Sequence, residues 1–154
     1  MKRPRVALFD AALGSAIPPL AAAVPPPWYW AVVALSPGEW TSSEGTLIIP
    51  RTKSQSCPCA HEGCIRDAVV AWLPERAIVV AVLIRPALQC LAYCSDVVVA
   101  PTTLAAWCRA ESIPIRTVTR TEYLLPLFTK LVSSDTVGSR HRAQLYRNYL
   151  AEVE

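Results

Sequence analysis

Three nearly continuous apolar runs, each followed by a segment of helical spacing, constrain this chain more than any other feature of its sequence. The runs cover residues 77–84, 96–100 and 113–118, and they are rich in valine and isoleucine. A strand with one solvated face would alternate apolar and polar residues, whereas these runs hardly alternate. Continuous β-branched runs are typical of parallel strands that are covered on both faces. The sequence therefore predicts a strand–helix–strand–helix–strand unit at the centre of an α/β fold.

The rest of the chain adds further strands and helices to this unit. Strands are expected over residues 6–9, 28–35 and 46–49, and the last two flank the turn sequence Ser-Pro-Gly-Glu at 36–39. A turn of this kind can join its flanking strands as an antiparallel hairpin at one edge of the sheet. Helices are expected over residues 11–23, 61–73, 86–94 and 102–109, after Thr121, and over 135–153.

These elements predict one three-layer α/β domain over residues 1–154. Its sheet is expected to be mostly parallel, with five or six strands and helices on both faces, because connections between parallel strands are right-handed crossovers. A length of 154 residues suits a single domain.

Composition excludes several classes of protein. Only 18% of the residues are charged and 53% are hydrophobic, which argues against a disordered acidic or basic tail. No apolar stretch of membrane-spanning length is free of charges and prolines. The basic N-terminus followed by alanines resembles a secretory signal, but Asp10, Pro18 and Pro19 interrupt its apolar part. We therefore expect a cytoplasmic protein with no membrane partner, in which the six cysteines are thiols or metal ligands.

Four potential metal ligands lie within eight residues of one polar loop. They are Cys57, Cys59, His61 and Cys64, a set of thiols and an imidazole that suits zinc. The single residue between Cys57 and Cys59 is shorter than the usual spacing of paired zinc ligands. Redox-active thiols and plain loop or core cysteines are the alternatives. Zinc is the only cofactor that the sequence suggests.

A second candidate site lies where the predicted parallel strands end. Arg85, Thr102, Thr103 and Arg120 all follow such strands, and Thr102 is the expected N-cap of a helix. Free backbone N–H groups at a helix start, together with nearby arginines, favour an anion such as phosphate. No glycine-rich loop follows a strand of this unit, so the dinucleotide and P-loop patterns are both missing. The alternative is an ordinary cap with solvated arginines.

The C-terminal third has a local excess of positive charge, although the net charge of the chain is only +3. Between residues 109 and 147 there are seven lysines and arginines against three acids. In the predicted last helix, Arg140 and Arg147 lie on one face, where we expect them to be exposed, and a tyrosine stripe lies on another. Together with Arg85, Thr102, Thr103 and Arg120, these two arginines predict an α/β module that binds an anionic partner, with nucleic acid as the leading candidate.

Two other classes of function remain open from the sequence. The Pro-Pro-Pro-Trp-Tyr-Trp segment at 25–30 and the last helix can dock another protein, unless the tryptophans of that segment pack inward. A metal-dependent hydrolase or nuclease would need acids to converge, with Asp10 at the end of the first strand as one of them. No catalytic residue can be assigned, and the sequence does not decide whether the protein is an enzyme.

Overall fold

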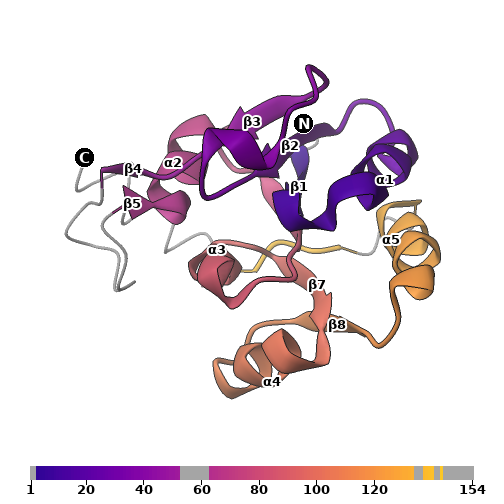
Figure 1. The fold of residues 1–154 in the computed structure, drawn as a ribbon. Coiled ribbons are helices and arrows are strands. Elements are labelled where there is room, and N and C mark those ends of the chain that lie inside the picture. The colour runs from indigo at the N-terminus through magenta and orange to yellow at the C-terminus, as the bar shows by residue number, and fades with distance from the viewer. Residues whose placement is uncertain (1–2, 53–62, 134–136, 141–142, 144–154) are drawn as a thin grey trace.

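The computed structural model of the chain describes residues 3–52, 63–133, 137–140 and 143. Its centre is a six-stranded parallel sheet with the strand order β3-β2-β1-β6-β7-β8 (Figure 1). A separate antiparallel pair, β4 (Arg51–Thr52) and β5 (Gly63–Cys64), lies outside this sheet. The predicted three-layer α/β fold is confirmed. The main strands are β1 (Arg5–Asp10), β2 (Tyr29–Val33), β3 (Thr46–Ile48), β6 (Ile78–Val82), β7 (Val97–Pro101) and β8 (Ile115–Val118).

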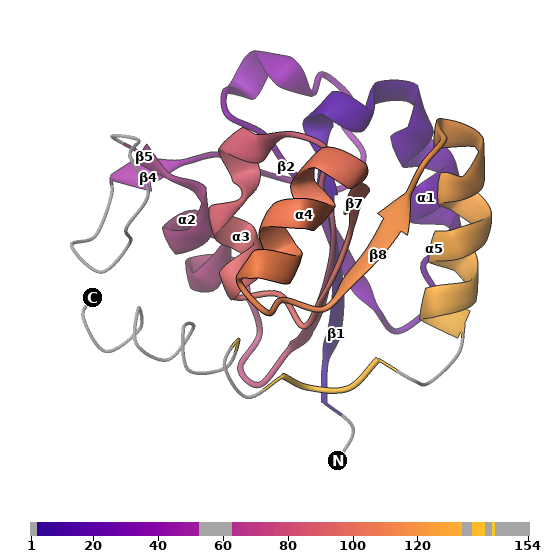
Figure 2. The same cartoon turned by 90° about the horizontal axis from the view of Figure 1, so that it is seen from below.

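Helices cover both faces of the sheet (Figure 2). One face carries α1 (Ile17–Ala23) and α5 (Leu124–Ser133), and the other carries α2 (Ile65–Trp72), α3 (Cys90–Tyr93) and α4 (Thr102–Ala110). Short 3-10 turns join several of these elements. They are η1 (Ala11–Ala16), η2 (Pro37–Glu39), η3 (Pro86–Leu88) and η4 (Thr121–Tyr123). No helix in the described part of the chain is long and apolar enough to cross a membrane.

The continuous apolar runs follow directly from this layering. In β1, Val6 and Leu8 pack into the core beneath α2–α4, whereas Ala7 and Phe9 pack into the core beneath α1 and α5. Every residue of β6 is buried for the same reason. Phe9 meets the Phe128 ring of α5 edge to face, with 5.4 Å between the ring centroids. Alternate residues of a strand face two different cores. A polar side chain at any position would therefore be buried, which is energetically unfavourable unless it is hydrogen-bonded.

The predicted antiparallel hairpin is wrong, because β2 and β3 run parallel in the register Ala31↔Thr46 to Val33↔Ile48. The Ser-Pro-Gly-Glu sequence forms η2 instead of a tight reversal. A side chain of η2, that of Glu39, bonds to Arg85 beyond the end of β6. The chain therefore crosses the carboxyl edge of the sheet and returns to the amino end before β3 starts.

Two predicted helix starts are also wrong. The N-cap of α4 is Pro101, which extends β7 and makes no side-chain capping bond, so Thr102 is the first residue of the helix. Residues 137–140 are not helical, although the predicted last helix begins at Asp135. The backbone N–H of Arg140 donates to the carboxylate of Asp96 at 2.6 Å, a contact that holds this segment beside the start of β7.

Candidate functional site

The carboxyl edge of the sheet is the natural place for a site in this fold. Counted along the chain, the six main strands have the order 3-2-1-4-5-6, which is a doubly wound order. Connections leave β1 toward one side of the sheet and β6 toward the other, so these neighbours form the topological switch point. Ligands of such sheets bind in the crevice outside the carboxyl ends of the strands. An ion-pair cluster and a pocket lie there.

Asp10 and Arg85 join the ends of β1 and β6, and we call this pair the Asp10–Arg85 clamp. Asp10 is fully buried. Its Oδ2 accepts the backbone N–H groups of Ile84 and Arg85, both at 3.0 Å. Its Oδ1 accepts the Ala12 N–H and the Arg85 Nε–H, both at 2.9 Å. The carboxylate is thus saturated by donors, which compensates the cost of burying its charge.

Glu39 binds the outer side of the same guanidinium. Arg85 donates to Glu39 Oε2 at 2.6 Å and to Oε1 at 3.0 Å, a bidentate pair. The backbone N–H of Leu35 also donates to Glu39 Oε1, at 2.7 Å. The hydrogen bond from Arg85 lowers the pKa of Glu39 more than burial raises it. In return, the bond to Glu39 raises the pKa of Arg85. The sequence predicted that Arg85 binds an anion, and in the structure the anions at Arg85 are the protein's own carboxylates, those of Asp10 and Glu39.

The lowered pKa of Glu39 makes its contribution to stability depend on pH. In the folded protein this pKa lies below the ordinary value of 4.5, so the contribution is present above 4.5 and is lost as pH falls through the folded value. Glu39→Gln should lower the free energy of unfolding by about 0.5–1 kcal/mol at neutral pH, since the pair is partly exposed. Urea unfolding from about pH 7 to about pH 3 should show the difference shrinking toward zero.

Glu122→Gln is the matched control for this experiment, because Glu122 also pairs with an arginine but is 64% exposed. It should change stability little at either end of the pH range. A deficit in Glu39→Gln that stays constant down to the lowest pH would show that the carboxylate charge is not the cause.

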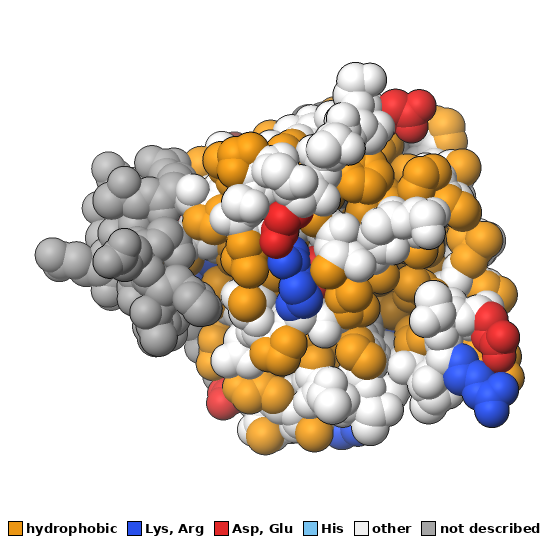
Figure 3. All heavy atoms as spheres, in the orientation of Figure 1, with side chains coloured by type: hydrophobic (Ala, Val, Ile, Leu, Met, Phe, Trp, Pro, Cys, Tyr) orange, Lys and Arg blue, Asp and Glu red, His pale blue; other side chains and the backbone are white. Residues whose placement is uncertain are grey.

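Beside the clamp lies a pocket of about 270 Å³, the carboxyl-edge pocket. Its wall is formed by η1 and the ends of β6, β7 and β8 together with the start of η4, and most of the lining is apolar. Figure 3 looks onto this edge and shows a largely hydrophobic surface around the central charged pair. The polar side chains in the lining belong to Thr119, Arg120 and Thr121.

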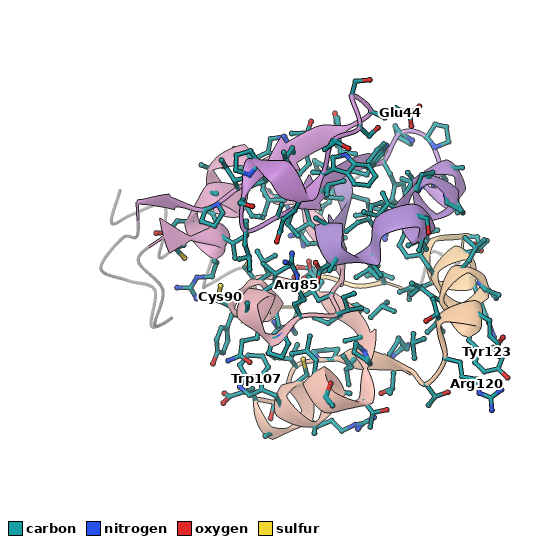
Figure 4. All side chains as sticks on the ribbon, in the orientation of Figure 1. Glu44, Arg85, Cys90, Trp107, Arg120 and Tyr123 are labelled. Carbon is teal, nitrogen blue, oxygen red and sulfur yellow. The ribbon has the colours of Figure 1, made fainter. Side chains whose placement is uncertain are left out.

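The structure separates the residues of the predicted anion site. Arg85 lies near the middle of the carboxyl edge, while Arg120 lies at the periphery next to Tyr123 and α5 (Figure 4). Arg120 is 70% exposed, lines the pocket, and pairs with Glu122 at 3.4 Å. Thr102 and Thr103 are exposed at the start of α4 and do not line the pocket. Arg120 is thus the one member of this set that contributes to the pocket wall.

Arg140 lies half-buried beside the other edge of the sheet, not on a solvated helix face. Its guanidinium donates to the backbone carbonyls of Ala92, Tyr93 and Ser95 at 2.8–3.0 Å. Ala92 and Tyr93 are the last two residues of α3, and Ser95 lies two residues beyond it. At such an end the carbonyl oxygens have no partner four residues further along the helix. Arg140 therefore acts as a C-terminal cap, and the expectation that it is an exposed arginine is wrong. Arg147 lies outside the described residues.

The predicted zinc loop lies mostly outside the described residues, which contain neither Cys57, Cys59 nor His61. Cys64 is described and buried, and its Sγ accepts the Asp67 N–H at the start of α2 at 3.4 Å. Within the described ranges, no group of three His, Cys, Asp or Glu side chains could hold a metal ion. Zinc binding stays a prediction of the sequence.

Sequence reasoning missed the clamp although it singled out both of its members. Asp10 and Arg85 each follow a buried strand, but their contact depends on β1 and β6 being neighbours. Glu39 was missed because a polar turn gives no signal for a distant partner.

No protein-family model matches this chain, and no curated protein matches it.

Proposed function

We propose that this protein binds a small organic anion in the carboxyl-edge pocket. The apolar body of the ligand would lie against the ends of β6, β7 and β8, and its anionic group would bind Arg120 at the rim. The observation that carries the proposal is an apolar pocket at the ends of three adjacent parallel strands with an exposed arginine in its lining. Small-molecule sites are commonly apolar cavities with a few polar groups that fix orientation.

Arg120 suits this role better than Arg85. Two carboxylates already neutralise Arg85, and one of them is buried beneath it. The partner of Arg120 is a single exposed acid, Glu122, and ion pairs of this kind contribute about 0–1 kcal/mol. An anion that enters the pocket can therefore replace Glu122 at little cost.

The geometry favours a small molecule over the nucleic acid that the sequence suggested for this edge. Arg85 and Arg140, two of the arginines expected to contact phosphates, are engaged in bonds within the protein. The pocket volume of about 270 Å³ lies near the lower end of the range for ligand sites. It suits a molecule of one or two rings, such as an aromatic carboxylate or a nucleotide base with its sugar phosphate.

Binding can be tested with anions paired with neutral counterparts. We would titrate benzoate, phenyl phosphate and adenosine monophosphate, beside benzamide and adenosine, and follow backbone amide shifts by NMR. The expected result is saturable movement of the amides of Ala12 and of Thr119–Thr121 with at least one anion. Arg120→Ala should lower the affinity for that anion at least about tenfold and leave the affinity for its neutral counterpart unchanged, since a charge-assisted hydrogen bond is worth about 1.5–3 kcal/mol.

Two further variants sharpen this test. Arg116→Ala removes an exposed arginine of β8 that does not line the pocket, and it should leave affinity unchanged. Ala12→Phe should fill the mouth of the pocket and abolish binding while the melting temperature stays the same, because the Ala12 side chain is exposed. Amide shifts that avoid the pocket lining, or equal losses in the Arg116 and Arg120 variants, would refute the proposal.

A further inference from the structure

The main sheet has an open edge at β8. This strand pairs with β7 on one side, and the strand order places no described strand on its other side (Figure 2). The Val98 N–H donates to the carbonyl of Pro114 at 3.0 Å, which fixes the parity of the ladder. Successive residues of a strand turn their N–H and C=O groups to opposite sides, so those of Arg116 face β7, whereas those of Ile115 and Thr117 face away from it. We call the outward N–H and C=O groups of these two residues the β8 edge.

Exposed arginines lie beside this edge on both faces of the sheet. Arg109, in the last turn of α4, donates to the Thr117 hydroxyl at 2.8 Å, so its guanidinium lies beside β8 on the face that α4 covers. Arg116 has the same parity as Val118, which packs against the core beneath α1 and α5, so its side chain lies on the other face. Within the described part of the chain neither arginine forms an ion pair, and residues 112–120 include no acid. The β8 edge is therefore flanked by two positive charges.

We infer that the β8 edge binds an extended acidic peptide, which adds a strand to the sheet. Strand addition of this kind takes its affinity from main-chain hydrogen bonds at an exposed sheet edge. The N–H and C=O groups of Ile115 and Thr117 bond to the peptide backbone, and carboxylates of the peptide reach Arg109 and Arg116 on the two faces. The inference goes beyond the proposed function, because none of these four residues lines the carboxyl-edge pocket.

Charge favours an acidic peptide over a second copy of this chain at the β8 edge. In a two-fold dimer the same edge of each copy would face the other. Arg109 and Arg116 of both copies would then gather along one junction, with no acid of residues 112–120 to neutralise them. Like charges on neighbouring strands destabilise their pairing, whereas an acidic strand places opposite charges beside the same arginines.

Amide hydrogen exchange followed by NMR tests the backbone pairing residue by residue. The probe is a capped peptide of sequence Val-Glu-Glu-Val-Glu-Glu-Val, which carries acids on both faces when it is extended. At saturation the amides of Ile115 and Thr117 should exchange at least about tenfold more slowly, because they gain acceptors. The amides of Arg116 and Val118 face β7 already, so their exchange should change little and provides the internal control.

A modified peptide separates strand pairing from simple charge attraction. The same sequence with an N-methylated backbone keeps its carboxylates and loses its N–H donors. Its affinity, measured by fluorescence anisotropy of labelled peptide, should be at least about tenfold lower, since main-chain bonds supply most of the binding. The lysine counterpart of the peptide should not bind.

Variants of the chain test the same edge from the protein side. Thr117→Pro removes an outward N–H and should abolish binding, and proline is tolerated on an edge strand when the missing N–H faces solvent. Thr117→Val, which removes only the hydroxyl, should keep binding. Arg116→Gln should lower affinity about threefold, the size expected of an exposed ion pair. Arg76→Gln, at an exposed arginine in the loop before β6, should leave affinity unchanged.

Three results would overturn the inference, and the exchange experiment on the unaltered chain decides it even where Thr117→Pro does not fold. Unchanged exchange of the Ile115 and Thr117 amides would show that the arginines only protect the edge from aggregation. Equal affinity of the N-methylated peptide would show charge attraction without strand pairing. Protection of the same amides without peptide, together with a dimer in analytical ultracentrifugation, would assign the edge to a second copy. None of these outcomes bears on Arg120, so this edge and the carboxyl-edge pocket can fail independently.

Discussion

Replacing Asp10 with asparagine should lower the free energy of unfolding by about 3–5 kcal/mol. The two carboxylate oxygens accept four hydrogen bonds, from the backbone N–H groups of Ala12, Ile84 and Arg85 and from the Arg85 side chain. Each oxygen accepts two of these bonds. An asparagine NH₂ group is a donor, so in place of either oxygen it would lie against two N–H groups and could accept neither bond. At the same time, the Arg85 guanidinium would lose its buried partner.

Urea unfolding measures this effect directly, and the melting temperature should fall by roughly 6–20 °C for a chain of this size. Glu75→Gln, at an exposed acid in the loop before β6, is the control and should change stability by less than about 0.5 kcal/mol. A double-mutant cycle with Arg85→Met isolates the coupling between the two side chains. A loss in Asp10→Asn no larger than that in the control would mean that the clamp does not stabilise the fold.

Arg140→Ala should be the second most damaging of these substitutions, with a loss of about 2–4 kcal/mol. The change leaves the carbonyls of Ala92, Tyr93 and Ser95 without the guanidinium that caps α3, and Ala92 and Ser95 are fully buried. Arg140→Lys should recover only part of the loss, because a single ammonium cannot match the planar fork of the guanidinium. The measurement is again the free energy of unfolding in urea.

The exposed arginine Arg109 supplies the control for this prediction. Its guanidinium donates to the Thr117 hydroxyl at 2.8 Å on the surface, so Arg109→Ala should cost less than about 1 kcal/mol. Similar losses in the Arg109 and Arg140 variants would show that the carbonyl contacts add little. An Arg140→Ala protein as stable as wild type would restore the view of Arg140 as a free surface charge.

The sheet could be predicted from the sequence because its signal is local. Residues 77–84 and 97–100 are apolar at every position, and the usual explanation of that pattern is a strand covered on both faces. The direction of β3 could not be predicted in the same way. The Ser-Pro-Gly-Glu sequence is compatible with a hairpin, and nothing in it indicates that Glu39 accepts hydrogen bonds from Arg85, 46 residues further along the chain.

The candidate site was only partly predictable, for a related reason. The apolar runs place Asp10, Arg85 and Arg120 at strand ends, but strand order decides which strand ends are neighbours. Since β6 pairs with β1, Arg85 meets Asp10 and is neutralised, while Arg120 pairs with an exposed acid and lines a pocket two strands away. Arg140 shows the same limit, because a basic residue near the C-terminus gives no sign that its partners are backbone carbonyls.

The position of β1 also sets an order of events during synthesis. β1 is made first, yet it pairs on one side with β2 and on the other with β6, and the Arg85 side chain that bonds to Asp10 lies 75 residues downstream. Until β6 leaves the ribosome, one edge of β1 is unpaired and the Asp10 carboxylate lacks the Arg85 guanidinium. Open strand edges invite pairing with other chains. Fragments that end before β6 should therefore aggregate, and the complete chain should fold slowly, as expected when pairing partners lie far apart in sequence.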